Sequence, residues 1–423
     1  MSFAPQPAAN ERIRHSPHQS GVNVGCAVAY SLAPMSTTFR FTTAGESHGP
    51  GLTTIVEGLP AGLELDREAL DRDMARRQLG HGRGGRMKIE SDAVEVRSGV
   101  RHGRTLGSPV AVLVANRDYA NWEERMSPWP VEAEVDEVHL PRPGHADLVG
   151  AQKYGHDDIR NVLERASARE TAARVAAGSL ARGLLSAFGV SVHSHVTQIA
   201  SVRAPERDDL SPGDFATVDD DPVRCLEPEA SAAMVEEINR LRKENESLGG
   251  SFEVRAFGLV PGLGSHISWE DRLDGRLAGA VASIQSVKGV AIGEAWDVAG
   301  RPGSDAHDEI FWSDERGYYR ETNHAGGLEG GMTNGQPLSV RAAIKPISTL
   351  TKPLRSVDTE SKQPAQALRE RTDSTVVPAA AVVAEAMVCL TLARCYREKF
   401  GGDHIDDALA AAEAYKKRID WRG

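Results

Sequence analysis

Four stretches of the chain combine glycine or proline with His, Ser, Arg or Lys side chains and too few acidic residues to match them: residues 44–51, 80–88, 140–178 and 323–351. Glycine lets a ligand approach the backbone closely, and guanidinium and ammonium groups bind carboxylates and phosphates. Histidine titrates near neutral pH, so His48 and His145 are candidates for proton transfer. The residues alone predict a site for a small anion with several charges.

The stretch 140–178 contains the start of a helix. Ser167 and Glu170 have the spacing of a capping box, and an Ala-rich run over 172–185 follows them. The first N–H groups of a helix and its dipole favour an anion, and Arg165 and Arg169 flank this helix start. A capped surface helix with solvated arginines explains the same residues, so the capping box alone leaves both interpretations open.

The stretch 323–351 has five glycines, followed by Lys345 and the hydroxyls of Ser348 and Thr349. Such a loop suits a cofactor that carries a phosphate. Glycine clusters also occur in plain turn-rich connections, and this alternative remains open on the residues alone.

Common cofactor and metal motifs are absent or out of context. Gly80, Gly82 and Gly85 form G-x-G-x-x-G, but they follow a predicted helix and precede a predicted strand, the reverse of a dinucleotide-binding turn. The chain has no P-loop and no H-E-x-x-H sequence. His193 and His195 alternate on a predicted strand without a Cys or carboxylate at ligand spacing, so we expect no metal site.

The overall charge limits the class of partner. Lys and Arg number 49 and Asp and Glu number 60, which gives a net charge of −11. Nucleic acid binding needs a basic surface, so we expect the arginine clusters to bind a small molecule instead. The four cysteines include no C-x-x-C pair, which is typical of a reduced, cytoplasmic protein. We find no apolar run of about 18 residues and predict no membrane span.

Hydrophobic periodicity predicts a mixture of helices and strands. Alternating patterns predict strands at 39–41, 52–57, 94–100, 110–114, 190–202, 251–260 and 337–345. Caps and longer periodic runs predict helices at 66–78, 172–185, 230–246, 270–287 and 378–400. The second half repeats the order of loop, strand and Ala-rich helix seen in the first half, which suggests an internal pseudo-repeat.

Five motifs occur in order along the chain: TAGESHG (Thr43–Gly49), RPGHAD (Arg142–Asp147), RASARETAARVAAG (Arg165–Gly178), GGLEGGMTNGQPL (Gly326–Leu338) and KPIST (Lys345–Thr349). Together they resemble the chorismate synthase family over about Phe39 to Gly402. The resemblance implies an α+β fold, a β-α-β sandwich with helices between antiparallel sheets. It also implies a single domain over residues 35–423 after a disordered extension at 1–34, and a cytoplasmic homotetramer.

The resemblance implies a lyase of the shikimate pathway. It would convert 5-enolpyruvylshikimate 3-phosphate to chorismate and phosphate by a 1,4-anti elimination that needs reduced FMN without net redox change. NADPH is implied only as an indirect reductant. An NADPH-dependent flavin reductase and a noncatalytic anion-binding protein are the alternatives, and the missing dinucleotide signal disfavours the reductase.

The matching motif positions imply roles for individual residues. His48 would protonate the leaving phosphate, His145 would control the protonation of the reduced flavin, and Asp373 would relay a proton. The substrate anions would be held by Ser47, Arg77, Arg83, Arg142 and Arg169. FMN would be held by Arg165, Ala166, Ser167, Gln285, Ser286, Gly330, Lys345, Pro346, Ile347, Ser348, Thr349 and Arg371. The segment 119–137 looks variable, and we expect it not to touch these residues.

Overall fold

The computed structural model describes residues 39–84, 92–369 and 372–421. The predicted extension at 1–34 and the predicted FMN residue Arg371 lie outside these residues. The two halves of the described chain follow the same plan: an antiparallel sheet, a helix between its second and third main strands, and one long helix after the sheet.

The first half forms a four-stranded antiparallel sheet. Its strands are β1 (Arg40–Ala44), β2 (Gly51–Glu57), β3 (Val94–Val96) and β6 (Val110–Ala115), in the spatial order β1-β2-β6-β3. Helix α1 (Arg67–Gln78) comes between β2 and β3, and α4 (Thr171–Ala187) follows the sheet. Thr54 on the buried face of β2 donates a hydrogen bond to the carbonyl of Ala173, so this face of the sheet packs against α4.

The second half forms a sheet with the same topology. Its strands β7 (Ser191–Ile199), β9 (Gly250–Phe257), β15 (Leu338–Ile344) and β10 (Val287–Ile292) are neighbours in that order, and the short β8 (Val202–Arg203) extends the edge beside β7. Helix α6 (Leu273–Ala282) comes between β9 and β10, and α8 (Val377–Phe400) follows β15. Both sheets therefore have the order first, second, fourth, third, with antiparallel neighbours throughout. This shared order supports the pseudo-repeat that the sequence suggested.

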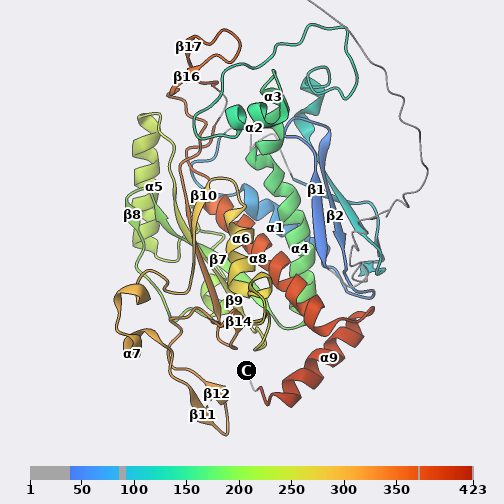
Figure 1. The fold of residues 1–423 in the computed structure, drawn as a ribbon, viewed down its shortest axis with the longest axis vertical. Helices are drawn as coiled ribbons and strands as arrows, with labels where there is room; N and C mark the ends of the chain where they lie inside the picture. Colours follow the sequence, from blue (N-terminus) through green and yellow to red (C-terminus); the bar gives the residue numbers. More distant parts are fainter. Residues whose placement is uncertain (1–38, 85–91, 370–371, 422–423) are drawn as a thin grey trace, which may run out of the picture. The chain divides into compact units, whose positions relative to one another are not determined.

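The long helices occupy the middle of the fold. Helices α4 and α8 pack against each other, α4 also packs on the first sheet, and α8 packs on the second. Figure 1 shows them side by side between β1 and β2 on one side and β7 and β9 on the other. The predicted sandwich of helices between two antiparallel sheets is confirmed.

Helix α8 corrects the prediction that no segment could span a membrane. By length and composition it is apolar enough to do so, but 89% of its apolar window is buried inside the protein. A helix that is apolar on every side is expected where helices and a sheet enclose it. We therefore interpret α8 as a core helix.

Several predicted elements differ in their bounds. The predicted strand over 94–100 ends at Val96, and Gly99 further on has a φ of 79°; the one over 190–202 breaks at Ala200, which has a φ of 48°. The predicted helix over 270–287 is confined to α6. The remaining elements are α2 (Asp147–Tyr154), α3 (Arg160–Ala166), α5 (Pro228–Lys243), α7 (Gly303–Ala306), α9 (Ile405–Arg418), and the strand pairs β4 (Val100–Arg101) with β5 (Arg104–Thr105), β11 (Phe311–Ser313) with β12 (Gly317–Tyr319), β13 (Leu328–Glu329) with β14 (Met332–Thr333), and β16 (Arg355–Val357) with β17 (Pro364–Gln366).

Candidate active site

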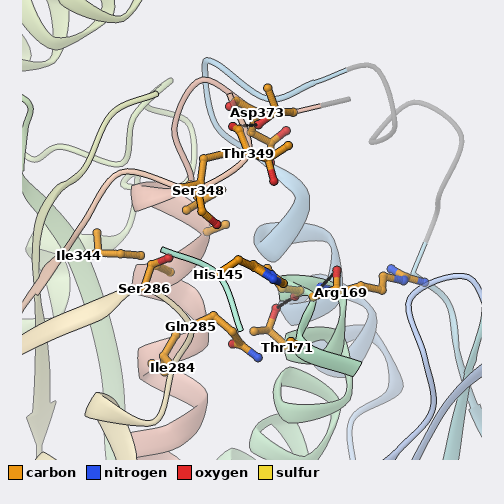
Figure 2. Close-up of a pocket in the computed structure, with 18 of the residues that line it drawn as sticks. His145, Arg169, Thr171, Ile284, Gln285, Ser286, Ile344, Ser348, Thr349 and Asp373 are labelled. Atoms are coloured by element: carbon orange, nitrogen blue, oxygen red, sulfur yellow. Dashed lines mark hydrogen bonds between the residues drawn. The ribbon is translucent and has the colours of Figure 1, made fainter. Parts of the chain in front are cut away.

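A cavity of about 510 Å³ lies where α4 and α8 begin. Most of the predicted site residues line it: Ser47, His48, Arg77, Arg83, Arg142, His145, Ala166, Ser167, Arg169, Gln285, Ser286, Lys345, Ile347, Ser348, Thr349 and Asp373. Figure 2 shows Ser348, Thr349 and Asp373 at one end of the cavity, Thr171, Ile284 and Gln285 at the other, and His145 between them. Its size is within the usual range for small-molecule sites.

Two helix N-termini meet at this cavity. Ser167 and Thr171 at the start of α4 line it, as do Val376 and Ala379 at the start of α8. The Ser167 hydroxyl accepts a hydrogen bond from the backbone N–H of Arg169 at 3.3 Å, so Ser167 caps the 3-10 turn Ala168–Glu170 that leads into α4, whereas α4 itself begins without a side-chain cap. The other half of the predicted capping box is absent, because the carboxylate of Glu170 binds side chains that include Thr43 and Arg174 instead. Both helix dipoles favour negative charge in the cavity.

His48 is held by a carboxylate and covered by an indole. Its Nδ1 lies 2.9 Å from Oε2 of Glu164, which leaves Nε2 for a ligand. Its ring stacks on Trp122 with the centroids 3.9 Å apart, so the expectation that segment 119–137 does not touch the site is wrong. Residues 45–49 spell G-x-S-x-G, but this loop joins two antiparallel strands and not a strand to a helix, so Ser47 does not sit on a nucleophile elbow.

Asp147 organises Arg142 and His145. This fully buried carboxylate accepts from Nε of Arg142 at 2.8 Å and contacts Nδ1 of His145. Burial disfavours its ionised form, but the hydrogen bonds from His145 and Arg142 outweigh this effect and hold the pKa of Asp147 well below its usual range. Arg142 also donates to the hydroxyl of Thr349, 3.2 Å away, which connects the two halves of the cavity wall.

Asp92 lies behind two of the predicted substrate arginines. Its carboxylate is buried and accepts hydrogen bonds from both Arg77 and Arg169. Burial alone would raise the pKa of Asp92. The charges of the two guanidinium groups have the larger, opposite effect, so the pKa is lowered overall. One carboxylate thus orients two cations at the same wall.

Asp373 and Lys345 close the cavity on the side of the second half. The Asp373 carboxylate accepts from the backbone N–H of Gly84 and pairs with Arg83 at 3.0 Å. The Lys345 ammonium donates to the carbonyl of Gly144 at 2.6 Å. Gly144 has a φ of 80°, a left-handed conformation that favours glycine, and a Cβ there would crowd the Lys345 nitrogen at 3.1 Å.

Three predicted FMN residues are not in the cavity wall. Arg165 is exposed and donates to the backbone carbonyls of Thr43 and Gly45. Gly330 is exposed in the turn between β13 and β14. Pro346 is adjacent to the lining residues Lys345 and Ile347 in sequence but does not line the cavity itself.

The comparisons with known proteins agree with the motifs. The family model described as chorismate synthase matches residues 39–396. The chain belongs to the chorismate synthase family. A chorismate synthase of Symbiobacterium thermophilum is 58% identical over 388 residues, 90% of this chain and 99% of the relative. A chorismate synthase of Rubrobacter xylanophilus is 57% identical over 383 residues, 90% and 97% of the two chains. A crystal structure of a chorismate synthase matches with a TM-score of 0.73 at 39% identity, over 90% of this chain and 98% of that one.

Within this chorismate synthase fold, the sequence did not predict four residues that contact site side chains from outside the cavity wall. Asp147 and Glu164 lie in or directly beside the motifs, at the end of RPGHAD and just before RASARETAARVAAG, so their position was a usable signal. Asp92 and Trp122 lie outside every motif. Only the fold brings them to Arg169 and His48.

Proposed function

We propose that this cavity is where the chain, a lyase of the chorismate synthase family, converts 5-enolpyruvylshikimate 3-phosphate to chorismate and phosphate. The observation that carries the proposal is the charge of the cavity wall. Arg77, Arg83, Arg142, Arg169, Lys288 and Lys345 line it with Asp373 as the one lining carboxylate among the described residues, in a chain whose net charge is −11. The substrate carries a phosphate and two carboxylates, which bind to such a wall.

The described residues also fit reduced FMN. Nε of Arg77 and Oε1 of Gln285 are buried polar atoms that have no hydrogen-bond partner among the described residues, as expected where a polar ligand binds. Ile284, Ile344 and Val383 give the cavity an apolar wall against which a flat ring can pack. We propose that Ala166, Ser167, Gln285, Ser286, Lys345, Ile347, Ser348 and Thr349 hold the cofactor. Arg165, Gly330 and Pro346 do not line the cavity, so the resemblance alone supports them.

We propose the following division of roles. Reduced FMN, when bound, supplies the transient electron density that eases cleavage of the C–O bond. Nε2 of His48 donates a proton to the departing phosphate, with the imidazole oriented by Glu164. His145, oriented by Asp147, holds the proton near the cofactor, and Asp373 relays the proton lost from the substrate. The arginines hold the substrate anions during these steps.

The family suggests where the protein works and how it assembles. We propose a cytoplasmic homotetramer whose subunit is one domain over residues 35–423. NADPH would act as an indirect reductant of the flavin. A flavin reductase as the main function is disfavoured, because the chain matches chorismate synthases over nine-tenths of its length.

Anaerobic turnover tests the proposal. The protein is incubated with 5-enolpyruvylshikimate 3-phosphate and chemically reduced FMN, without NADPH, and chorismate is measured. We expect chorismate to form, and His48→Ala to lower kcat about 100-fold or more, because a general acid contributes about 10²- to 10⁴-fold. No chorismate from the wild type would refute the function, whereas full turnover by His48→Ala would refute only the role of His48.

A further inference from the structure

The ring of His48 is fixed in two directions. Glu164 holds Nδ1 through a contact of 2.9 Å to its Oε2. Trp122 covers one face of the ring, with the centroids 3.9 Å apart and an angle of 24° between the planes. Rotation of the imidazole would break both contacts. The two contacts therefore fix the direction in which Nε2 points.

Trp122 is itself held in place by polar contacts. Its Nε1 donates to the carboxylate of Asp118 at 3.1 Å. The guanidinium of Arg160 lies 5.4 Å from the centre of the indole, and the same guanidinium pairs with Glu164 at 3.5 Å. The contacts therefore form a closed cycle, in which each of four side chains contacts the next: Arg160, Trp122, His48 and Glu164.

A purely structural role does not explain this arrangement well. Trp122 follows a 3-10 turn over Arg117–Asn121 that has no buried residue, and it belongs to none of the hydrophobic clusters of the described chain. Its ring contacts are with His48 and with the guanidinium groups of Arg160 and Arg125. The indole thus covers a site histidine and not the core.

We propose that Trp122 is a positioning residue for His48: with Glu164, it holds the imidazole so that Nε2 is presented to the leaving phosphate. This inference rests on the proposed function, in which His48 is the acid. Misplacement of a reacting group by about 1 Å can cost about 100-fold in rate, so loss of one of two restraints is expected to lower the rate measurably.

Variants of Trp122 test the inference in the anaerobic assay. We expect Trp122→Ala to lower kcat about 10-fold, intermediate between no effect and full misplacement, and to change KM less than about 2-fold. Trp122→Phe keeps an aromatic face and should recover most of the loss. Trp129, in the same segment but 77% exposed, gives the control Trp129→Ala, for which kcat should not change. If Trp122→Ala fails to fold, Trp122→Leu fills the space without offering a ring face.

A double-mutant cycle of Trp122 and His48 tests whether the two residues act together. If Trp122 acts through His48, replacing it in the His48→Ala background should cause no further loss of kcat. An equal loss of kcat in both backgrounds, with unchanged circular dichroism, would overturn the positioning role. Full turnover by His48→Ala alone would instead refute the acid role of His48, so the two failures are distinguishable.

Discussion

At the scale of single residues, a carboxylate outside the cavity wall orients most of the site's arginines and one of its imidazoles. Asp92 does so for Arg77 and Arg169, Asp147 for Arg142, and the described structure gives His48 the carboxylate of Glu164. The lining keeps an excess of positive charge because these carboxylates lie outside the cavity wall. Each one orients its partner without occupying the space of the ligand.

Asp147→Asn tests this arrangement. The amide keeps the size of the side chain but removes the charge, which leaves Arg142 buried without its counter-ion. We expect kcat/KM to fall about 100-fold, because Arg142 and His145 lose their common anchor. We expect the free energy of unfolding to fall by about 3 kcal/mol in urea titrations, as for a broken buried ion pair. Asp157→Asn, at an exposed position nearby, is the control and should change stability by no more than about 0.5 kcal/mol. Equal behaviour of the two variants would contradict the prediction.

The sequence predicted the cations of the site but, apart from Asp373, not the carboxylates that hold them. Arg142, His145 and Arg169 lie in motifs, and their residue types already indicate an anion site. Asp92 is 77 positions from Arg169, and a single carboxylate has no local pattern that names its partner. Trp122 was missed for the same reason, since only the folded chain brings it to His48.

At the scale of elements, the sequence located the helix starts but not their meeting point. Ser167 caps the 3-10 turn that leads into α4, and the first-turn Pro378 places the N-terminus of α8 correctly. That both N-termini line one cavity follows from the packing of α4 on α8. Local signals carry no information about such packing, because each helix would have the same cap in any arrangement.

Strand β9 carries a buried carboxylate whose titration can be measured. Glu253 contacts His195 on β7 and accepts from Ser339 on β15. Burial raises its pKa, but the hydrogen bond from His195 and the charge of Arg255 outweigh burial and lower the pKa of Glu253 to about 2. An unfolded glutamate titrates near 4.5. Between these values the unfolded state binds the additional proton, so this stabilisation is complete above about pH 4.5 and is lost as the pH falls towards 2.

Glu253→Gln is therefore expected to flatten the acid limb of the stability profile. The wild type should lose on the order of 3 kcal/mol more than the variant between pH 4.5 and 2, as measured by urea unfolding followed by circular dichroism. Glu236→Gln is the control, because Glu236 is an exposed carboxylate on α5. Parallel profiles for the wild type and Glu253→Gln would contradict the assignment.

At the scale of the whole molecule, a charged cluster joins the two halves. Glu385 on α8 is fully buried and forms two 2.8 Å hydrogen bonds with Arg76 of α1. It also pairs with Arg182 of α4 and with Arg224 of the second half. Neither the common strand order of the halves nor this contact could be predicted from the sequence. The identity between the halves is weak, and neither feature depends on a local pattern. Arg76 directly precedes Arg77, so the cluster also fixes the end of α1 at the cavity.

Glu385→Gln should consequently weaken the junction of the two halves. Removing the charge leaves the buried Arg224 and the partly buried Arg76 and Arg182 with fewer counter-charges, and breaking a buried ion pair costs about 3–5 kcal/mol. We expect a loss of about 3 kcal/mol in urea unfolding, followed by both tryptophan fluorescence and circular dichroism. Glu398→Gln, on the same helix but with its carboxylate partly exposed beside Arg394 and Arg276, should cost less than about 1 kcal/mol. If the halves depend on Glu385, the two probes should separate in Glu385→Gln while they coincide in Glu398→Gln. Coincident transitions and equal losses in both variants would mean that apolar packing of α4 on α8 holds the halves together without the buried charges.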